Sequence, residues 1–142
     1  MQIRFAQPQD VRIIYQFVCE LEATAFDFFI FEKLFIKNIT RPNYFYLVAE
    51  IDKTLVGYLS CHSQFLLHHC GLVGEIQELF IASSHRNSGI GQALVSSIQQ
   101  IANENNWINL EVSCNKKRIN THRFYRRLGF VDTHLKFVLP IK

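Results

Sequence analysis

Three consecutive runs of β-forming residues occupy the middle of the chain, and they limit the folds that it can adopt. The runs cover residues 44–51, 54–67 and 73–82, and the polar pair Asp52-Lys53 separates the first two. Two such runs joined by a short polar break are typical of an antiparallel hairpin. The third run follows soon after, so the sequence predicts a sheet with an antiparallel centre.

A short strand and two helices are predicted before these runs. Residues 3–6 resemble a first strand, and Pro8 stands where a helix can begin, with Asp10 adding a favourable negative charge to its first turn. A second, phenylalanine-rich helix is expected to end near Arg41, because the residue before Pro42 resists the helical conformation. The first helix is indicated by apolar residues at helical spacing, namely Ile13, Ile14, Phe17, Val18 and Leu21.

The C-terminal half alternates helices and strands. Helical periodicity restarts at Ile90, a strand is predicted over 107–112, and a short helix after it ends at Gly129. The segment 130–139 is expected to close the sheet. With no repeats or linkers, the order βααβββαβαβ predicts one α/β (α+β) domain with a mixed sheet, and the helical crossover before 107–112 predicts a parallel strand pair.

Composition and charge exclude several classes of protein. Hydrophobic residues make up 49% of the 142 residues and charged residues 19%, which is too apolar for a disordered chain. No apolar run reaches the ~20 residues that cross a bilayer, and the N-terminus lacks the apolar stretch of a secretory signal, so a cytoplasmic protein without membrane partners is expected. The net charge of +3 is compatible with an anionic small ligand, and no basic stripe typical of nucleic-acid binding is present. The four cysteines lack metal-type and redox-type spacing.

The turn after the third run carries the clearest chemical signal. Strand residues through Ile81 lead into a turn with Arg86, Gly89 and Gly91, and this turn opens a helix. Backbone N–H groups at such a helix N-terminus form an anion site suited to a diphosphate, the glycines allow close approach, and Arg86 can add a charge-assisted bond. Neither a G-x-G-x-x-G fingerprint nor a Walker A lysine is present, and the glycines alone also fit an ordinary connecting loop.

Two motifs in this half resemble the GCN5-related N-acetyltransferase (GNAT) family. The turn just described, after Leu79-Phe80-Ile81, is similar to the family's coenzyme A motif, and the stretch 124–130 (FYRRLGF) is similar to its other signature. The resemblance spans essentially the whole chain. It implies a mostly antiparallel sheet of six to seven strands with about four helices and a splayed parallel pair in the middle. It also implies acetyl-coenzyme A as co-substrate, bound by Leu79, Phe80, Ile81, Arg86, Asn87, Ser88, Gly89, Ile90, Gly91 and Asn115.

Catalysis in such an acyltransferase needs a base that deprotonates a primary amine and an acid that protonates the leaving thiolate. Tyr125 matches the general acid of the family, although a tyrosine on an amphipathic helix is also common as a half-buried structural residue. Glu78 and Glu75 are the candidate bases, and Glu78 is preferred. On a regular strand their carboxylates point to opposite faces, so only one faces the substrate unless a bulge intervenes.

Further positions resemble the aminoalkylphosphonate N-acetyltransferases, a branch of this family that acetylates small aminophosphonates. Thr121 and the aromatic second helix depart from the pattern of that branch. The run Lys116-Lys117-Arg118 also fits a solvated charge run or a site for the 3′-phosphate of coenzyme A. Cationic side chains suit a phosphonate, and the candidates are Arg118, Lys117, Arg123 and His68. Glu75 and Phe26 complete the implied substrate site. The resemblance is carried by residues 19–21, 26–27, 62–69, 74–79, 115–118 and 122–125.

Several alternatives stay open at this point. The acceptor can instead be an amino acid, a polyamine or a protein lysine, or the chain can be a coenzyme A-binding module without catalysis. His62 and His68 share a strand face by parity, and metal dependence is associated with the resembling branch, but there is no compact ligand motif and no metal ligand is assigned. The sequence leaves the oligomeric state open, with a homodimer as one option.

Overall fold

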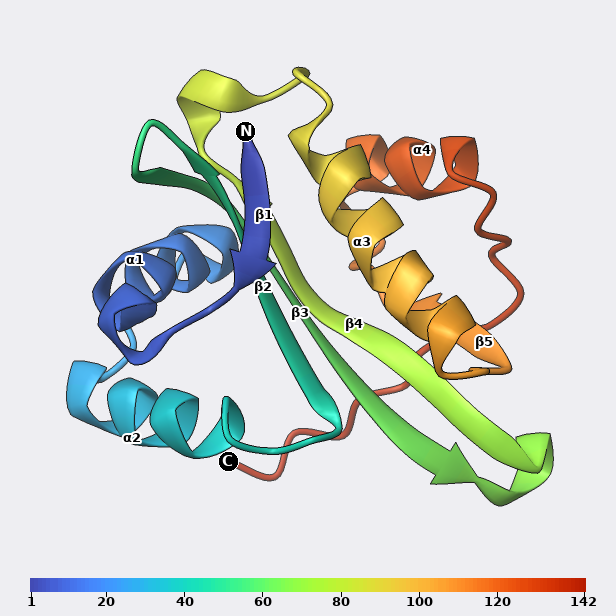
Figure 1. Cartoon of the computed structure of the whole chain (residues 1–142). Coiled ribbons are helices and arrows are strands. Elements are labelled where there is room, and N and C mark those ends of the chain that lie inside the picture. The colour runs from blue at the N-terminus through green and yellow to red at the C-terminus, as the bar shows by residue number, and fades with distance from the viewer.

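Four α-helices and five strands make up the fold, and the computed structural model describes all 142 residues (Figure 1). The strands are β1 (Gln2–Phe5), β2 (Tyr44–Ile51), β3 (Thr54–Leu66), β4 (Gly71–Ile81) and β5 (Asn109–Val112). The helices are α1 (Val11–Glu22), α2 (Phe28–Asn38), α3 (Ile90–Glu104) and α4 (Ile119–Arg127). Short 3₁₀ turns cover Pro8–Asp10, Leu67–His69 and Ser83–His85.

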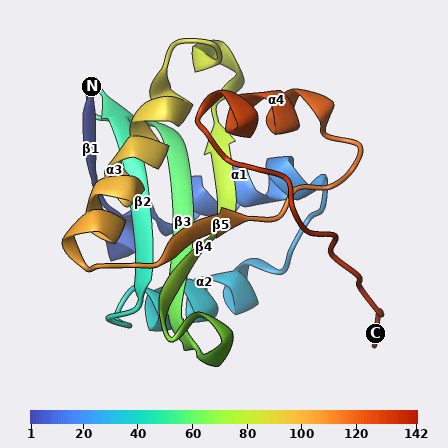
Figure 2. The same ribbon diagram turned by 90° about the vertical axis from the view of Figure 1, so that its right-hand side faces the viewer.

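The five strands form one sheet in the order β1-β2-β3-β4-β5. The first four pair antiparallel and β5 runs parallel to β4, which confirms the mixed, mostly antiparallel sheet. The prediction of six to seven strands was wrong, because residues 130–139 do not form a strand. A strand persists only where its backbone groups find a partner, and this segment runs away from β5 without pairing (Figure 2).

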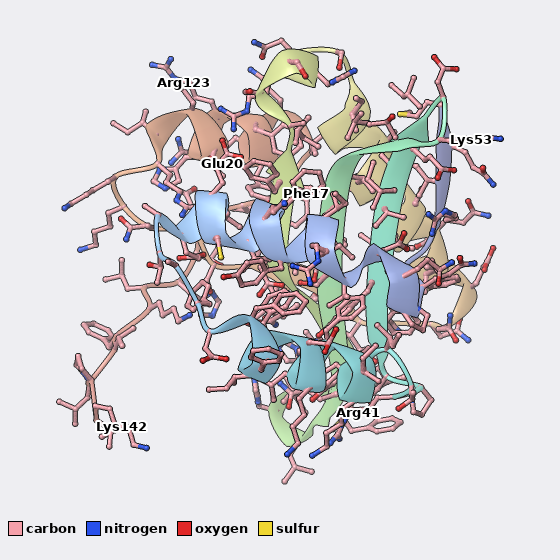
Figure 3. All side chains as sticks on the ribbon, turned by 90° about the vertical axis from the view of Figure 1, so that its left-hand side faces the viewer. Phe17, Glu20, Arg41, Lys53, Arg123 and Lys142 are labelled. Carbon is pink, nitrogen blue, oxygen red and sulfur yellow. The ribbon has the colours of Figure 1, made fainter.

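Helices cover both faces of the sheet (Figure 1). On one face α1 and α2 pack over an aromatic core, and Phe17 of α1 contacts Phe80 of β4 with ring centroids 5.0 Å apart (Figure 3). On the other face α3 and α4 cover a mainly aliphatic core. The buried members of that core are Leu47, Ala49, Val56, Leu59, Cys61, Ile76, Ile90, Leu94, Val95, Ile98 and Tyr125. No helix combines the length and the apolar character that a membrane crossing requires.

A bulge interrupts the pairing of β3 with β4. Cys61 lies opposite Ile76 and Ser60 lies opposite Glu78, so Gln77 is an extra residue on β4. An extra residue reverses the alternation of side chains beyond it. Ile76 and Leu79 therefore both face the α3 core, although regular alternation would place them on opposite faces.

The ends of the helices largely follow the sequence signals. Gly129 has a φ of 94°, and its N–H donates to the carbonyl of Arg126 while the N–H of Phe130 donates to the carbonyl of Tyr125. This is the hydrogen-bond pattern of a Schellman motif, and it confirms Gly129 as the residue that ends α4. The second helix ends at Asn38, a few residues before the predicted limit near Arg41.

Candidate active site

The turn before α3 has the geometry of an anion site. Gly89 is the N-cap of α3 with a φ of 84°, and no side chain caps the helix. The first backbone N–H groups of α3 are therefore free of side-chain partners and point out of the helix end. A Cβ on Gly89 would meet nothing within 4 Å, so glycine is favoured here by its backbone conformation and the space in front of the turn is open.

Gly91 also has a packing role that the sequence did not indicate. A Cβ at this position would lie 3.2 Å from Cζ and 3.3 Å from Cε1 of Phe124. The missing side chain thus lets α3 approach α4, and the two sequence motifs are in direct contact.

Arg86 and Ser88 hold the shape of the turn. Arg86 Nε donates to the carbonyl of Ile81 at 3.1 Å, and its guanidinium lies 5.5 Å from the centre of the Phe80 ring. The Ser88 hydroxyl donates to the carbonyl of His85. Asn87, between them, adopts a left-handed conformation with a φ of 60°. These contacts fix the conformation of the turn, and its backbone N–H groups lie near the guanidinium of Arg86.

The gap between the parallel strands begins beyond Ile76 and Val112, the last pair in the β4–β5 register. β4 continues to Ile81 while β5 ends, so Leu79 and Phe80 have no strand partner on that side. The parallel pair lies at the edge of the sheet and not in the middle as predicted, because β5 has no further strand beside it. Unpaired backbone groups along a strand can bind an extended ligand as an added strand does.

Glu78 lies in a partly buried polar site on the α1 side of this gap. The hydroxyls of Ser60 and Tyr58 donate to Glu78 Oε1, the latter at 3.3 Å, and the Glu78 N–H donates to Ser60 Oγ at 3.1 Å. Burial raises the pKa of the Glu78 carboxyl, the two hydroxyls oppose this shift, and the charge of Glu22 adds to it. A desolvated carboxylate of this kind is a stronger proton acceptor than an exposed one.

The bulge at Gln77 also settles the geometry of the two glutamates. Glu75 lies opposite His62 in the register and Glu78 lies opposite Ser60. On a regular strand these two residues would point to opposite faces. The extra residue Gln77 reverses the alternation between them, so both carboxylates lie on the face covered by α1 and α2.

Tyr125 extends from α4 into the aliphatic core, where only 5% of its surface is exposed. Its ring packs edge-on against Phe124 and Phe130, with centroids 5.1 and 5.2 Å apart. Burial raises the pKa of its phenol, and the nearby Cys114 thiol adds to this shift, so the hydroxyl stays protonated at neutral pH. No other side chain is hydrogen-bonded to that hydroxyl, and no fully buried side-chain oxygen lacks a partner, so the hydroxyl oxygen is not fully buried.

The loop after β5 leads to α4 and carries Asn115 and Arg118. Asn115 Oδ1 accepts from the N–H of Lys117 at 3.0 Å, and the Asn115 carbonyl is 2.8 Å from Nε2 of His122. Arg118 reaches across to the end of α1, where Nη2 donates to the carbonyl of Leu21 at 2.9 Å. The guanidinium is thus fixed near the α1 terminus that also carries Glu22.

The remaining predicted substrate residues lie in two places. Phe26 is in the loop between α1 and α2, and its carbonyl accepts from the hydroxyl of Tyr15. His68 lies in the 3₁₀ turn at the tip of the β3–β4 hairpin, beyond the end of β3. Strand residues advance about 3.3 Å each, so the length of β4 puts His68 roughly 20 Å from Glu78. His68 is therefore not brought to the site, and no three His, Cys, Asp or Glu side chains converge as a metal site.

Sequence reasoning missed the residues that tune the charged groups. Ser60, Tyr58 and Glu22 act on Glu78, and Cys114 acts on Tyr125. Ser60 and Tyr58 are polar residues in an otherwise apolar part of β3, which was a usable signal. Glu22 and Cys114 carried no signal of their own.

Known proteins resemble this chain in sequence and in structure. Residues 13–130 match the acetyltransferase (GNAT) family. An aminoalkylphosphonate N-acetyltransferase of Salmonella typhimurium is 35% identical over 96% of this chain and 88% of its own length. A glucosamine 6-phosphate N-acetyltransferase of Candida albicans is 30% identical over 51% of this chain and 47% of its own. An N-acetyltransferase of unassigned substrate from Archaeoglobus fulgidus is 30% identical over 88% of this chain and 89% of its own.

Solved structures agree on the fold. A protein from Bacillus halodurans described as a transcriptional regulator superposes with a TM-score of 0.91 at 21% identity, over 99% of both chains. A ribosomal-protein-alanine N-acetyltransferase from Brucella melitensis superposes with a TM-score of 0.82 at 18% identity, over 99% of this chain and 100% of its own. The family match and the sequence relatives show that the chain belongs to the acetyltransferase (GNAT) family and is an acyltransferase whose co-substrate is acetyl-coenzyme A.

Proposed function

We propose that the chain acetylates the primary amine of a small aminoalkylphosphonate. The observation that carries the proposal is the position of Arg118, whose guanidinium is held 2.9 Å from the Leu21 carbonyl at the end of α1. The same helix end carries Glu22, which is near enough to Glu78 to raise its pKa. A planar cation at the helix end whose Glu22 also acts on the Glu78 carboxyl suits a molecule with a tetrahedral anion at one end and an amine at the other. The Salmonella typhimurium relative, whose name states this substrate class, supports the same acceptor.

Glu78 is the proposed general base. An alkyl amine has a pKa of about 10 and must lose a proton before it attacks a thioester. The raised pKa of the partly buried Glu78 carboxyl brings it closer to the pKa of the amine, and the hydroxyls of Ser60 and Tyr58 keep the carboxylate oriented. Glu75, on the same face, is the alternative base or a contact for the amine.

Tyr125 is the proposed general acid. Its phenol is protonated at neutral pH, because burial raises its pKa, and the hydroxyl is free of partners within the protein. Its ring is fixed between Phe124 and Phe130, so the proton is offered from a defined position. Protonation of the sulfur makes the thiol a better leaving group than the thiolate.

The co-substrate is proposed to lie along β4 and the turn before α3. The amides that follow Gly89 and the guanidinium of Arg86 would bind the diphosphate. The unpaired edge at Leu79 and Phe80 would bind the extended arm, and an N–H near Phe80 would polarise the carbonyl that the amine attacks. Asn115, at the end of β5, is proposed to contact the same arm.

A second candidate acceptor is an amino-sugar phosphate. The Candida albicans relative is named for glucosamine 6-phosphate, which also combines an amine with a tetrahedral phosphorus oxyanion. The match covers 51% of this chain, so it supports the shared chemistry less strongly than the Salmonella typhimurium relative does.

An acceptor panel tests the proposal. Thiol release from acetyl-coenzyme A would be measured with 2-aminoethylphosphonate, and with ethylamine as the matched amine that lacks the phosphonate. Charge-assisted hydrogen bonds contribute about 1.5–3 kcal/mol each, so we expect kcat/KM to be at least ~10-fold higher for the phosphonate. Equal values for the two amines would reject the phosphonate assignment. Turnover confined to glucosamine 6-phosphate would favour the second candidate.

A further inference from the structure

A tight turn between β5 and α4, residues 115–118, carries two of the proposed ligand contacts (Figure 2). Asn115 is proposed to contact the arm of coenzyme A, and Arg118 to bind the anionic end of the acceptor. The two residues are three positions apart, so whatever fixes the 115–118 turn places both contacts at once.

The turn itself orients the side chain of Asn115. Asn115 Oδ1 accepts from the Lys117 N–H at 3.0 Å. Only the oxygen of an amide can accept from an N–H, so this bond decides which end of the amide points away from the turn. Asn115 is exposed, and its Nδ2 makes no hydrogen bond within the chain. The Nδ2 group is therefore free to donate to a carbonyl of a bound ligand.

The backbone carbonyl of Asn115 is the point at which the turn is held to the next helix. It accepts from the Arg118 N–H at 3.0 Å, which closes the turn, and it lies 2.8 Å from Nε2 of His122 on α4. A carbonyl oxygen can only accept, so the imidazole donates from Nε2. The backbone N–H of His122 also donates to the Arg118 carbonyl at 3.1 Å. One residue of α4 thus holds both ends of the turn.

We propose that His122 is a positioning residue, whose Nε2–H holds the turn so that Asn115 and Arg118 both reach their ligands. The far side of the turn is tied to α1, where Arg118 Nη2 donates to the Leu21 carbonyl at 2.9 Å. Without the imidazole donor the turn keeps this tie but loses the one from its Asn115 carbonyl to the α4 side chain. The role of Arg118 rests on the proposed function, whereas the role of Asn115 requires only the co-substrate.

Three substitutions of His122 test the role of its N–H. Glutamine can place a side-chain N–H near the position of the imidazole Nε2, asparagine is one methylene too short, and leucine has no donor. His122→Leu and His122→Asn are expected to raise the Kd for acetyl-coenzyme A about 3–10-fold, the effect of one hydrogen bond, when measured by titration calorimetry. His122→Gln is expected to stay close to the wild-type value. Asn120→Leu, at an exposed position of the same helix, is the control and should leave the Kd unchanged.

Steady-state kinetics extend the test to the acceptor. The KM for 2-aminoethylphosphonate should rise in His122→Leu and recover in His122→Gln, while kcat changes little, because the imidazole acts through the turn. If wild type turns over this phosphonate and ethylamine equally, the proposed acceptor fails, and the calorimetry with acetyl-coenzyme A still decides the role of His122.

A double-mutant cycle separates positioning from a general loosening of the fold. If His122 acts through Asn115, His122→Leu should weaken the binding of acetyl-coenzyme A less in the Asn115→Ala background than in wild type. A loss of the same size in both backgrounds would overturn the proposed path through Asn115.

The tautomer of His122 provides a test on the wild-type chain, whose fold is not altered. Nitrogen NMR of the imidazole, assigned by the signals that disappear in His122→Gln, shows which ring nitrogen carries a proton. The proposal requires a proton on Nε2 at neutral pH, and a bare Nε2 would overturn it. It would equally be overturned by unchanged binding in His122→Leu, or by a loss in His122→Gln as large as that in His122→Leu.

Discussion

A Cβ atom on Gly91 would lie 3.2 Å from Cζ of Phe124, so the turn that begins α3 rests directly on α4. Phe124 in turn packs on Tyr125, with ring centroids 5.1 Å apart. The proposed diphosphate site and the proposed acid are therefore joined through one glycine and one aromatic ring. This contact joins the two motifs in the folded chain.

Gly91→Ala should destabilise the fold, although alanine is the better helix former. The new methyl group must displace the Phe124 ring by a few tenths of an ångström, and overpacking of this kind costs about 1–3 kcal/mol, against a helix-propensity gain of about 1 kcal/mol. We expect a lower Tm and weaker thermal stabilisation by acetyl-coenzyme A. Gln92→Ala, at the exposed neighbouring position, is the control and should leave both values unchanged.

Tyr125→Phe should lower kcat by about 10²-fold, the lower end of the usual contribution of general acid catalysis. The ring contacts with Phe124 and Phe130 are kept, so Tm and the KM for acetyl-coenzyme A should stay close to wild type. Steady-state kinetics and a thermal melt are the measurements. An unchanged kcat under conditions where chemistry limits the rate would remove Tyr125 from the mechanism.

Glu78→Gln should raise the thermal stability at high pH and lower the activity. Burial raises the pKa of Glu78 in the folded protein, so its contribution to stability is complete below the unfolded carboxyl pKa and is lost as the pH rises through the folded pKa. Glutamine keeps an acceptor for Ser60 and Tyr58 but carries no charge. The variant should therefore have a higher Tm than wild type at pH 8 and the same Tm as wild type near pH 4.

The same substitution should lower kcat/KM by at least ~100-fold, and the wild-type pH profile should fall on its acid side at a pH above the ordinary carboxyl pKa. Glu75→Gln, on the same face of the sheet, is the matched comparison. If Glu75→Gln loses the activity and Glu78→Gln retains it, the roles of the two carboxylates must be exchanged.

The sequence anticipated the elements whose signals are local. Helical periodicity and the proline and glycine positions gave α1, α3 and α4, and the β-rich runs gave β2, β3 and β4 close to their limits. The prediction of a strand over 130–139 was wrong for a reason that is not local in the sequence. Its residues alternate as a strand requires, but alternation cannot say whether an edge of the same chain lies within reach.

The candidate site divides in the same way. Arg86, Gly89 and Tyr125 lie in contiguous motifs, so the sequence was sufficient to identify them as candidate site residues. The bulge at Gln77 depends on how β3 pairs with β4, and it decides that Glu75 and Glu78 share a face. The shared strand face of His62 and His68 was wrong, because β3 ends at Leu66 and His68 lies in the turn after it.

Arg118→Gln should raise the KM for 2-aminoethylphosphonate by about 10–100-fold, because a charge-assisted contact to an anion contributes about 1.5–3 kcal/mol. The KM for ethylamine should change little, since that amine has no group for the guanidinium to bind. Arg118 also donates to the Leu21 carbonyl, so a general loosening of α1 is the competing explanation, and it would raise both KM values together. Lys116→Gln removes the same charge from an exposed position of the same loop and is the control. An equal rise in KM for both variants would mean that the loop acts through its overall charge, and Arg118 would lose its role as the phosphonate contact.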